Sequence, residues 1–125
     1  MDTRDDVERF MRAGEHAVYD QPRSGFDQQA MLYFDLCKEE FFELSAAVKK
    51  FDIVETADAA ADLIWVIEGL CHTLGIPLQD VWNEVSRSNF SKTVRGKLIK
   101  RGDGKILKPD TYSPPDIQSI VRPNK

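Results

Sequence analysis

Two long apolar patterns, separated by a short connection, constrain most strongly how this chain can fold. In the first, seven residues recur at steps of four and three, which is the spacing of one helix face packed on a neighbour: Ala30, Phe34, Cys37, Phe41, Leu44, Val48 and Phe51. The second spans residues 54–74 and has a row with similar spacing: Ala57, Ala61, Ile64, Ile67 and Cys71. The connecting stretch FDIVE is short enough to make the two predicted helices antiparallel neighbours.

The flanking segments complete a predicted set of four helices. Residues 3–19 predict a helix, because Thr3 can cap it, acidic residues suit its positive N-terminal end, and apolar residues follow at helical spacing. The stretch QPRSGF predicts a loop before the long second helix. TLGIP ends the third helix, and a fourth begins at Leu78 and fades within SRSNFSK.

The C-terminal segment predicts turns rather than helix. Two short runs, KLIK and KILK, flank RGDG, in which Asp103 and Gly104 are typical of a tight hairpin turn. YSPPD fits neither a helix nor a central strand. We therefore expect an all-α fold of four to five helices with a short C-terminal β-hairpin or irregular tail. The helical core is expected over residues 3–92 and the hairpin or tail over residues 93–125 of a single domain.

The composition favours one soluble domain. The chain has 125 residues, 42% hydrophobic and 30% charged, which suits one compact globular unit. There are 21 acidic and 17 basic residues and the pI is about 5.2, so we expect no partner among nucleic acids or anionic membranes. The most apolar run, residues 63–67, is too short to span a bilayer, and Cys37 and Cys71 lack a CxxC spacing. These features favour a cytoplasmic protein.

Acidic residues are embedded in both long apolar patterns. Glu40 and Glu43 fall on a half-apolar face of the second helix, and Glu55, Asp58 and Asp62 follow one another at steps of three and four on the third. Carboxylates gathered in a partly buried groove are costly unless they are protonated or neutralised, and hard oxygen ligands suit Mg²⁺ or Mn²⁺. We therefore expect a divalent metal site between the two helices, with a solvated acidic face as the alternative.

Four ordered segments of the sequence resemble a known superfamily. LCKEEFFELSAAV followed by VETADAAADLIWVIEGLCHTLGI resembles the all-α nucleoside triphosphate pyrophosphatases, which include MazG, phosphoribosyl-ATP pyrophosphatase and dimeric dUTPases, and whose signature is EExxE on one helix and ExxD on the next. EVSRSNFSK and DGKILKPDTYSPPDI resemble the C-terminal region of the MazG-like group of phages and bacteria. The resemblance covers about residues 28–118 and implies a MazG-like helical bundle.

The resemblance implies roles for the first acidic motif. Glu40 and Glu43 match acids expected to hold Mg²⁺, with Mn²⁺ as a substitute. Glu39 matches the first acid of EExxE, and it either binds the metal directly or positions the attacking water as a base. Glu39 is therefore the expected catalytic residue as well as a candidate ligand.

The second acidic motif departs from the family pattern. If Asp62 is the Asp of ExxD, Ala59 stands where the Glu should be; if Asp58 is that Asp, Glu55 fits but the apolar run begins late. We take Asp58 and Asp62 as the working metal ligands, because residues four apart share one helix face. Whether Glu55 or Asp58 completes the motif stays open, with Glu55 a possible outer ligand.

The implied function is Mg²⁺-dependent hydrolysis of a nucleoside triphosphate to the monophosphate and pyrophosphate, in a house-cleaning role toward non-standard nucleotides or dUTP. Arg87, Asn89 and Lys92 at the end of the fourth helix are the expected phosphate-binding residues. The alternatives are phosphoribosyl-ATP hydrolysis and a non-catalytic helical interaction or cation-binding module. Because both long helices have two apolar faces, a homodimer or homotetramer is expected.

Overall fold

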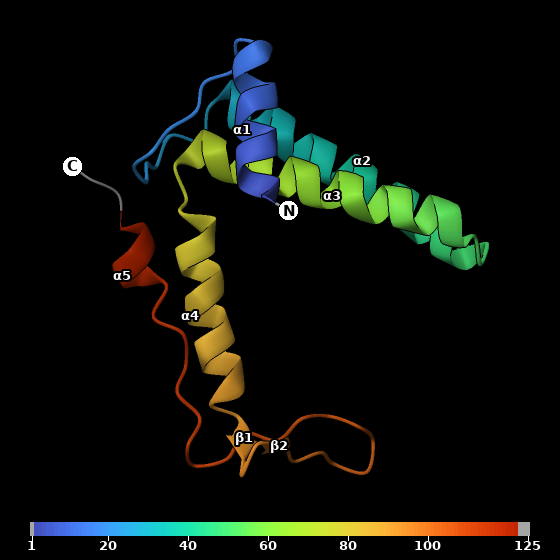
Figure 1. Ribbon diagram of the computed structural model, residues 1–125, viewed down its shortest axis with the longest axis vertical. Coiled ribbons are helices and arrows are strands. Elements are labelled where there is room, and N and C mark those ends of the chain that lie inside the picture. The colour runs from blue at the N-terminus through green and yellow to red at the C-terminus, as the bar shows by residue number, and fades with distance from the viewer. Residues whose placement is uncertain (1, 123–125) are drawn as a thin grey trace. The chain divides into compact units, whose positions relative to one another are not determined.

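The computed structural model describes residues 2–122 and is mainly helical (Figure 1). Its elements are α1 (Thr3–Ala13), α2 (Gln28–Lys49), α3 (Ile53–Leu74), α4 (Leu78–Phe90), β1 (Thr93–Val94), β2 (Lys97–Leu98) and α5 (Gln118–Val121). This composition confirms the predicted all-α fold class with a small C-terminal hairpin. The described chain forms two compact units, one ending at Pro77 and one comprising residues 78–122, and the expected single domain stays a prediction.

The helices of the first unit begin at aspartate caps. Asp2, Asp27 and Asp52 precede α1, α2 and α3, and each side chain accepts a hydrogen bond from a backbone amide three residues later. Such caps satisfy amides that have no partner inside the helix. The predicted cap at Thr3 is therefore wrong by one residue. The predicted helix over residues 3–19 is also too long, because Glu15 adopts a positive φ of 59° that an α-helix cannot contain.

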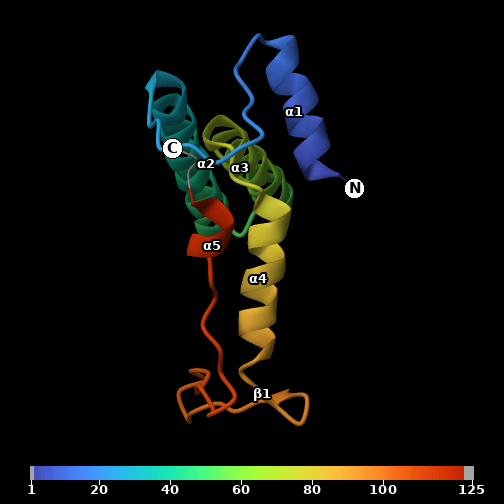
Figure 2. The same cartoon turned by 90° about the vertical axis from the view of Figure 1, so that its left-hand side faces the viewer.

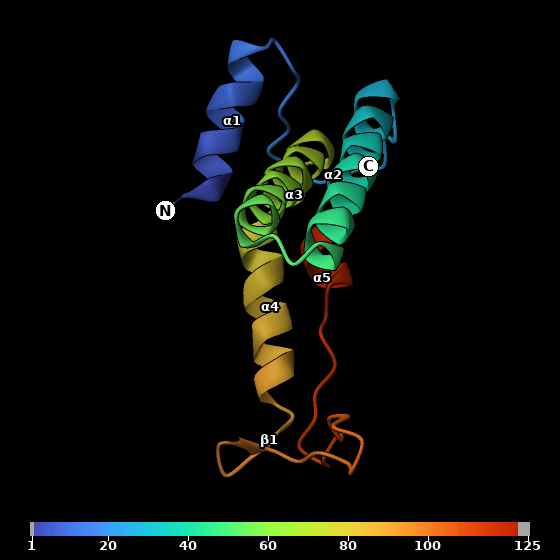
Figure 3. The same cartoon turned by 90° about the vertical axis from the view of Figure 1, so that its right-hand side faces the viewer.

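An antiparallel pair formed by α2 and α3 is the centre of the first unit, as the short connection predicted (Figures 1 and 3). The pair approaches closely at Gly69, because the ring of Tyr33 occupies the space that a Cβ atom on Gly69 would need. The phenol oxygen of Tyr33 is hydrogen-bonded to Nδ1 of His16 at 2.9 Å. α3 ends at Gly75, whose φ of 67° favours glycine.

α1 packs on α3 and helps to close a small core (Figure 2). The buried core residues are Val7, Met11, Tyr33 and Val66. Two buried polar residues of α3 hold the start of α1: Glu68 accepts a hydrogen bond from the Thr3 hydroxyl, and His72 Nε2 donates one to the Arg4 carbonyl, each at 2.9 Å.

The apolar row predicted as the core face of α2 is largely exposed in one chain. Phe34, Phe41 and Phe51 are 47%, 56% and 95% exposed, and of the seven residues only Ala30 is buried. The row of α3 fares similarly, since Cys71 alone of its five residues is buried. The physical reason is that α3 lies against the neighbouring face of α2, on which Tyr33 and Ala47 are buried. We call the exposed set, Phe34, Phe41, Val48 and Phe51, the outer row.

The second unit contains α4, a hairpin and residues 111–116, which we call the return segment. β1 and β2 pair antiparallel around Arg95 and Gly96, both at positive φ, and this hairpin was not predicted. The predicted turn at RGDG is confirmed: Lys100 and Ile106 form an antiparallel bridge, and Gly104 has φ 87°. The segment predicted to lack helix, residues 112–116, does so.

The return segment is bonded to α4 and runs beside it (Figures 1 and 2). Ser91 is the main anchor: its Oγ accepts from the Ser113 amide at 2.8 Å, and its carbonyl accepts from the Thr111 hydroxyl at 3.1 Å. Farther along, the Asp116 amide donates to Glu84 Oε2 at 2.7 Å. Within residues 2–122, no single helix is long and apolar enough to cross a membrane, although α3 and α4 taken together satisfy the length and composition criteria.

Candidate functional site

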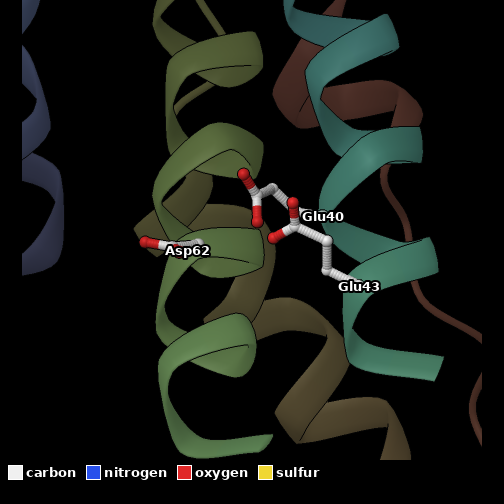
Figure 4. Close-up of side chains that lie close together, drawn as sticks. All are labelled: Glu40, Glu43 and Asp62. Atoms are coloured by element: carbon white, nitrogen blue, oxygen red, sulfur yellow. The ribbon is translucent and has the colours of Figure 1, made fainter. Parts of the chain in front are cut away.

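Three carboxylates from α2 and α3 come together in the first unit. Glu40 and Glu43 are three residues apart on α2, so they share a helix face, and both extend toward α3, which carries Asp62 (Figure 4). One oxygen from each of the three residues lies within 4.8 Å of the other two. The helix spacing sets the first pair, and the antiparallel packing of α2 on α3 brings in Asp62.

The electrostatics of this cluster centre on Glu40. Its Oε2 atom is buried and has no hydrogen-bond partner among the residues that the structure describes. Burial raises the pKa of Glu40, and the nearby carboxylates of Glu43, Asp62 and Glu39 raise it further. The cluster thus gathers negative charge without a compensating cation from the described chain. An unpartnered carboxylate oxygen beside two further carboxylates is a donor set that fits a hard divalent ion such as Mg²⁺.

The other predicted acids lie outside this close group. Glu39, Glu55 and Asp58 are exposed, and the group of candidate ligands found within residues 2–122 does not include them. Glu39 is still near enough to contribute to the raised pKa of Glu40. Of the two aspartates proposed on α3, the structure brings Asp62 to the α2 acids. The predicted roles of Glu39 and Asp58 stay predictions.

The predicted phosphate-binding residues lie in the second unit, where Arg87 is already engaged. Its guanidinium donates to both carboxylate oxygens of Glu84 at 2.8 and 2.9 Å and to the Pro114 carbonyl at 3.1 Å. The hydrogen bonds from Arg87 and from the Asp116 amide lower the pKa of Glu84 to about 2. Arg87 thus joins α4 to the return segment.

Asn89 and Lys92 form a second contact of α4. The Lys92 ammonium donates to Asn89 Oδ1 at 3.2 Å and lies 5.7 Å from the ring centroid of Tyr112. Lys92 is half-buried, whereas Asn89 is exposed. Neither side chain contacts a carboxylate among the residues that the structure describes, so both keep the capacity to meet a phosphate.

Residues 7–89 match the phosphoribosyl-ATP pyrophosphohydrolase family. The chain belongs to this family. The match covers more than half of the 125 residues and includes both helices of the acidic cluster. The family lies within the MazG-like all-α nucleoside triphosphate pyrophosphatases, which confirms the resemblance seen in the sequence. No curated protein shows significant similarity to the chain.

Membership in the phosphoribosyl-ATP pyrophosphohydrolase family indicates a pyrophosphohydrolase, a hydrolase that acts on acid anhydrides. The family is typically dependent on a divalent metal, which agrees with the acidic cluster. Sequence reasoning missed the engagement of Arg87 by Glu84 and Pro114. The spacing of Glu84 and Arg87 was a visible signal for an ion pair, but the contact with Pro114 depends on a segment 27 residues away.

Proposed function

We propose that the chain hydrolyses a nucleoside triphosphate to the monophosphate and pyrophosphate, with Mg²⁺ held by Glu40, Glu43 and Asp62. One observation carries this proposal: three carboxylate oxygens from two helices lie within 4.8 Å of one another, and a buried oxygen of Glu40 has no partner within residues 2–122. Such a group is costly without a cation and favourable with one. Mn²⁺ has the same preference for oxygen ligands and can substitute.

The residues around the cluster divide the work of hydrolysis. When bound, Mg²⁺ would neutralise phosphate charge and polarise the reacting phosphorus. Glu39, exposed next to Glu40, takes a proton from a water that attacks the α-phosphorus. A new bond forms between the water oxygen and this phosphorus, and the bond from the phosphorus to the bridging oxygen breaks, so that pyrophosphate leaves. Asp58, one turn before Asp62, supports the metal from outside the close group.

Phosphate recognition falls to Asn89 and Lys92. An amide and an ammonium can both donate hydrogen bonds to phosphate oxygens, and the Lys92–Asn89 contact holds the two side chains together. Arg87, the third predicted residue, positions the return segment through Glu84 and Pro114, and it reaches phosphate only if those contacts open.

A homodimer or homotetramer completes the proposal. Large apolar residues are exposed at many positions of the first unit, including the outer row and the α2–α3 connection, where Ile53 and Val54 are 78% and 75% exposed. An apolar surface of this kind is unusual on a monomer and marks an interface. A second copy of the chain offers a surface of the same chemistry.

Phosphoribosyl-ATP is the second candidate substrate, because the matched family carries that name. It presents the same triphosphate chain to the metal group and differs in its second ribosyl phosphate. The acidic cluster acts on the shared part, so it favours neither substrate over the other.

A substrate panel tests the proposal. The eight common nucleoside triphosphates, dUTP and phosphoribosyl-ATP would be incubated with the full chain and Mg²⁺, and pyrophosphate release would be measured. We expect turnover of at least one compound, near-complete loss in Asp62→Asn, and unchanged turnover in Asp35→Asn, an exposed acid of α2 outside the cluster. Absence of pyrophosphate release with every compound contradicts the proposed function. Turnover of Asp62→Asn within a few-fold of wild type contradicts the site.

A further inference from the structure

The second unit has a charge opposite to that of the whole chain. Residues 78–122 contain nine basic and five acidic residues, although the full sequence has a formal net charge of −4. Two of the arginines are neutralised, Arg87 by Glu84 and Arg101 by Asp103. Within residues 2–122, none of the lysines of this unit makes an ion pair. The uncompensated positive charge of this unit therefore resides largely on lysines.

Two of these lysines meet at one aromatic ring. The ammonium of Lys108 lies 5.0 Å from the ring centroid of Tyr112, and that of Lys92 lies 5.7 Å from the same centroid. Lys92 is also tethered, because its ammonium donates to Asn89 Oδ1 at 3.2 Å. Tyr112 is half-buried, so cation–π attraction at its ring is modest, and two like charges at one ring repel each other. A bound anion would relieve this repulsion.

Hydrogen bonds on both sides hold Tyr112 in place. The preceding residue, Thr111, donates its hydroxyl to the Ser91 carbonyl, and the following residue, Ser113, donates its amide to Ser91 Oγ. The Tyr112 amide donates to the Pro109 carbonyl at 2.9 Å. These bonds fix the backbone of residues 111–113 on the end of α4, next to Lys92. Lys108 follows the RGDG turn in the chain, and this turn positions the ammonium of Lys108.

We propose that Lys92 and Lys108, gathered at Tyr112, form an anion site for a di- or triphosphate chain. The site rests on the geometry of residues 89–113, which all belong to the second unit. A di- or triphosphate chain has several charged oxygens and can accept hydrogen bonds from both ammoniums at once. Lys108 is the new member of the site, and Tyr112 is its positioning residue.

The test uses inorganic tripolyphosphate, the full chain and a metal-free buffer with EDTA, so that the acidic cluster cannot contribute through Mg²⁺. Binding would be measured by isothermal titration calorimetry for wild type, Lys108→Gln and Lys97→Gln. Lys97 is the matched control, because it is an exposed lysine of β2 and its replacement removes the same charge. We expect Lys108→Gln to weaken binding about tenfold, as for one charge-assisted hydrogen bond, and Lys97→Gln to change it less than twofold.

Two further variants separate positioning from general charge. Tyr112→Phe keeps the ring and should retain wild-type affinity, whereas Tyr112→Leu removes the ring and should weaken binding several-fold. Circular dichroism melting of Tyr112→Leu shows whether the second unit is still folded. Equal losses in Lys108→Gln and Lys97→Gln would overturn the proposal, and so would undetectable binding of tripolyphosphate by wild type at millimolar concentration.

The nucleotide panel and the tripolyphosphate titration together distinguish this inference from the proposed function. If the nucleotide panel shows no hydrolysis but tripolyphosphate binding depends on Lys108, the anion site stands and the proposed function falls. If hydrolysis is found but Lys108→Gln and Lys97→Gln bind tripolyphosphate equally well, the proposed function stands and the anion site falls.

Discussion

Replacing Glu40 by Gln should make the metal-free protein more stable and its response to Mg²⁺ weaker. The Glu40 carboxylate faces those of Glu43 and Asp62 with oxygens within 4.8 Å. At that separation each pair of unit charges repels by about 1 kcal/mol at the dielectric constant of water, so the substitution removes about 2 kcal/mol of repulsion from the folded state. For a chain of this size, that corresponds to a rise on the order of 5–10 °C in melting temperature in EDTA.

The order of stability should reverse when Mg²⁺ is added. A ligand at about 100 times its Kd stabilises the folded wild type by about 2.7 kcal/mol, and Gln in place of a carboxylate removes most of that gain. Thermal melts in EDTA and across a Mg²⁺ titration measure both effects, with Asp35→Asn as the control outside the cluster. The reasoning fails if Glu40→Gln gains as much from Mg²⁺ as wild type does, or if it melts below wild type in EDTA.

Three further predictions address separate parts of the molecule. Gly69→Ala would place a Cβ atom about 3.0 Å from Cζ of Tyr33 and closer still to two other ring carbons. Urea unfolding should therefore show a free energy of unfolding that is lower by roughly 1–3 kcal/mol. An unchanged free energy of unfolding would mean that the Tyr33 ring moves aside at no cost. The pKa of Glu84 is lowered from 4.5 to about 2. The stabilisation from its hydrogen bonds to Arg87 and the Asp116 amide should therefore be complete above pH 4.5 and lost as the pH falls toward 2. The amide NMR shift of Asp116 should follow this titration, and a shift that is flat over this range would refute the contact. Glu39→Gln should lower turnover about a hundredfold or more yet keep the Mg²⁺-induced rise in melting temperature, and loss of both would make Glu39 a metal ligand.

The long helices could be predicted because their signals are local. Apolar spacing and the glycine after α3 act within a few residues, and the helix predicted over residues 54–74 begins one residue after the observed α3 and ends at the same residue. The aspartate caps are equally local signals, but the only cap predicted from the sequence was at Thr3. The end of α1 could not be found in this way. Ala17 continues the apolar spacing, but Glu15 takes a left-handed conformation that periodicity does not encode.

The sequence predicts which acids of the candidate site are neighbours on one helix, but not which aspartate of the other helix joins them. Glu40 and Glu43 are neighbours by helix geometry alone, and the short connection makes α3 their partner. Which aspartate of α3 faces them depends on the register between the helices, and single-helix spacing leaves Asp58 and Asp62 equivalent. Packing of Tyr33 on Gly69 sets that register, and Asp62 then joins the group.

The geometry of α2 also couples the metal cluster to the proposed oligomer. Glu40 faces α3, whereas the next residue, Phe41, belongs to the outer row and is 56% exposed. A second chain that covers the outer row would exclude water close to Glu40, and the lower local dielectric would strengthen its repulsion from Glu43 and Asp62. Association should therefore be weaker without a cation and stronger with one, because coupling between two binding events is reciprocal. Analytical ultracentrifugation in EDTA and in Mg²⁺ would measure this effect, and an association constant that does not change with Mg²⁺ would show that the interface lies away from the cluster.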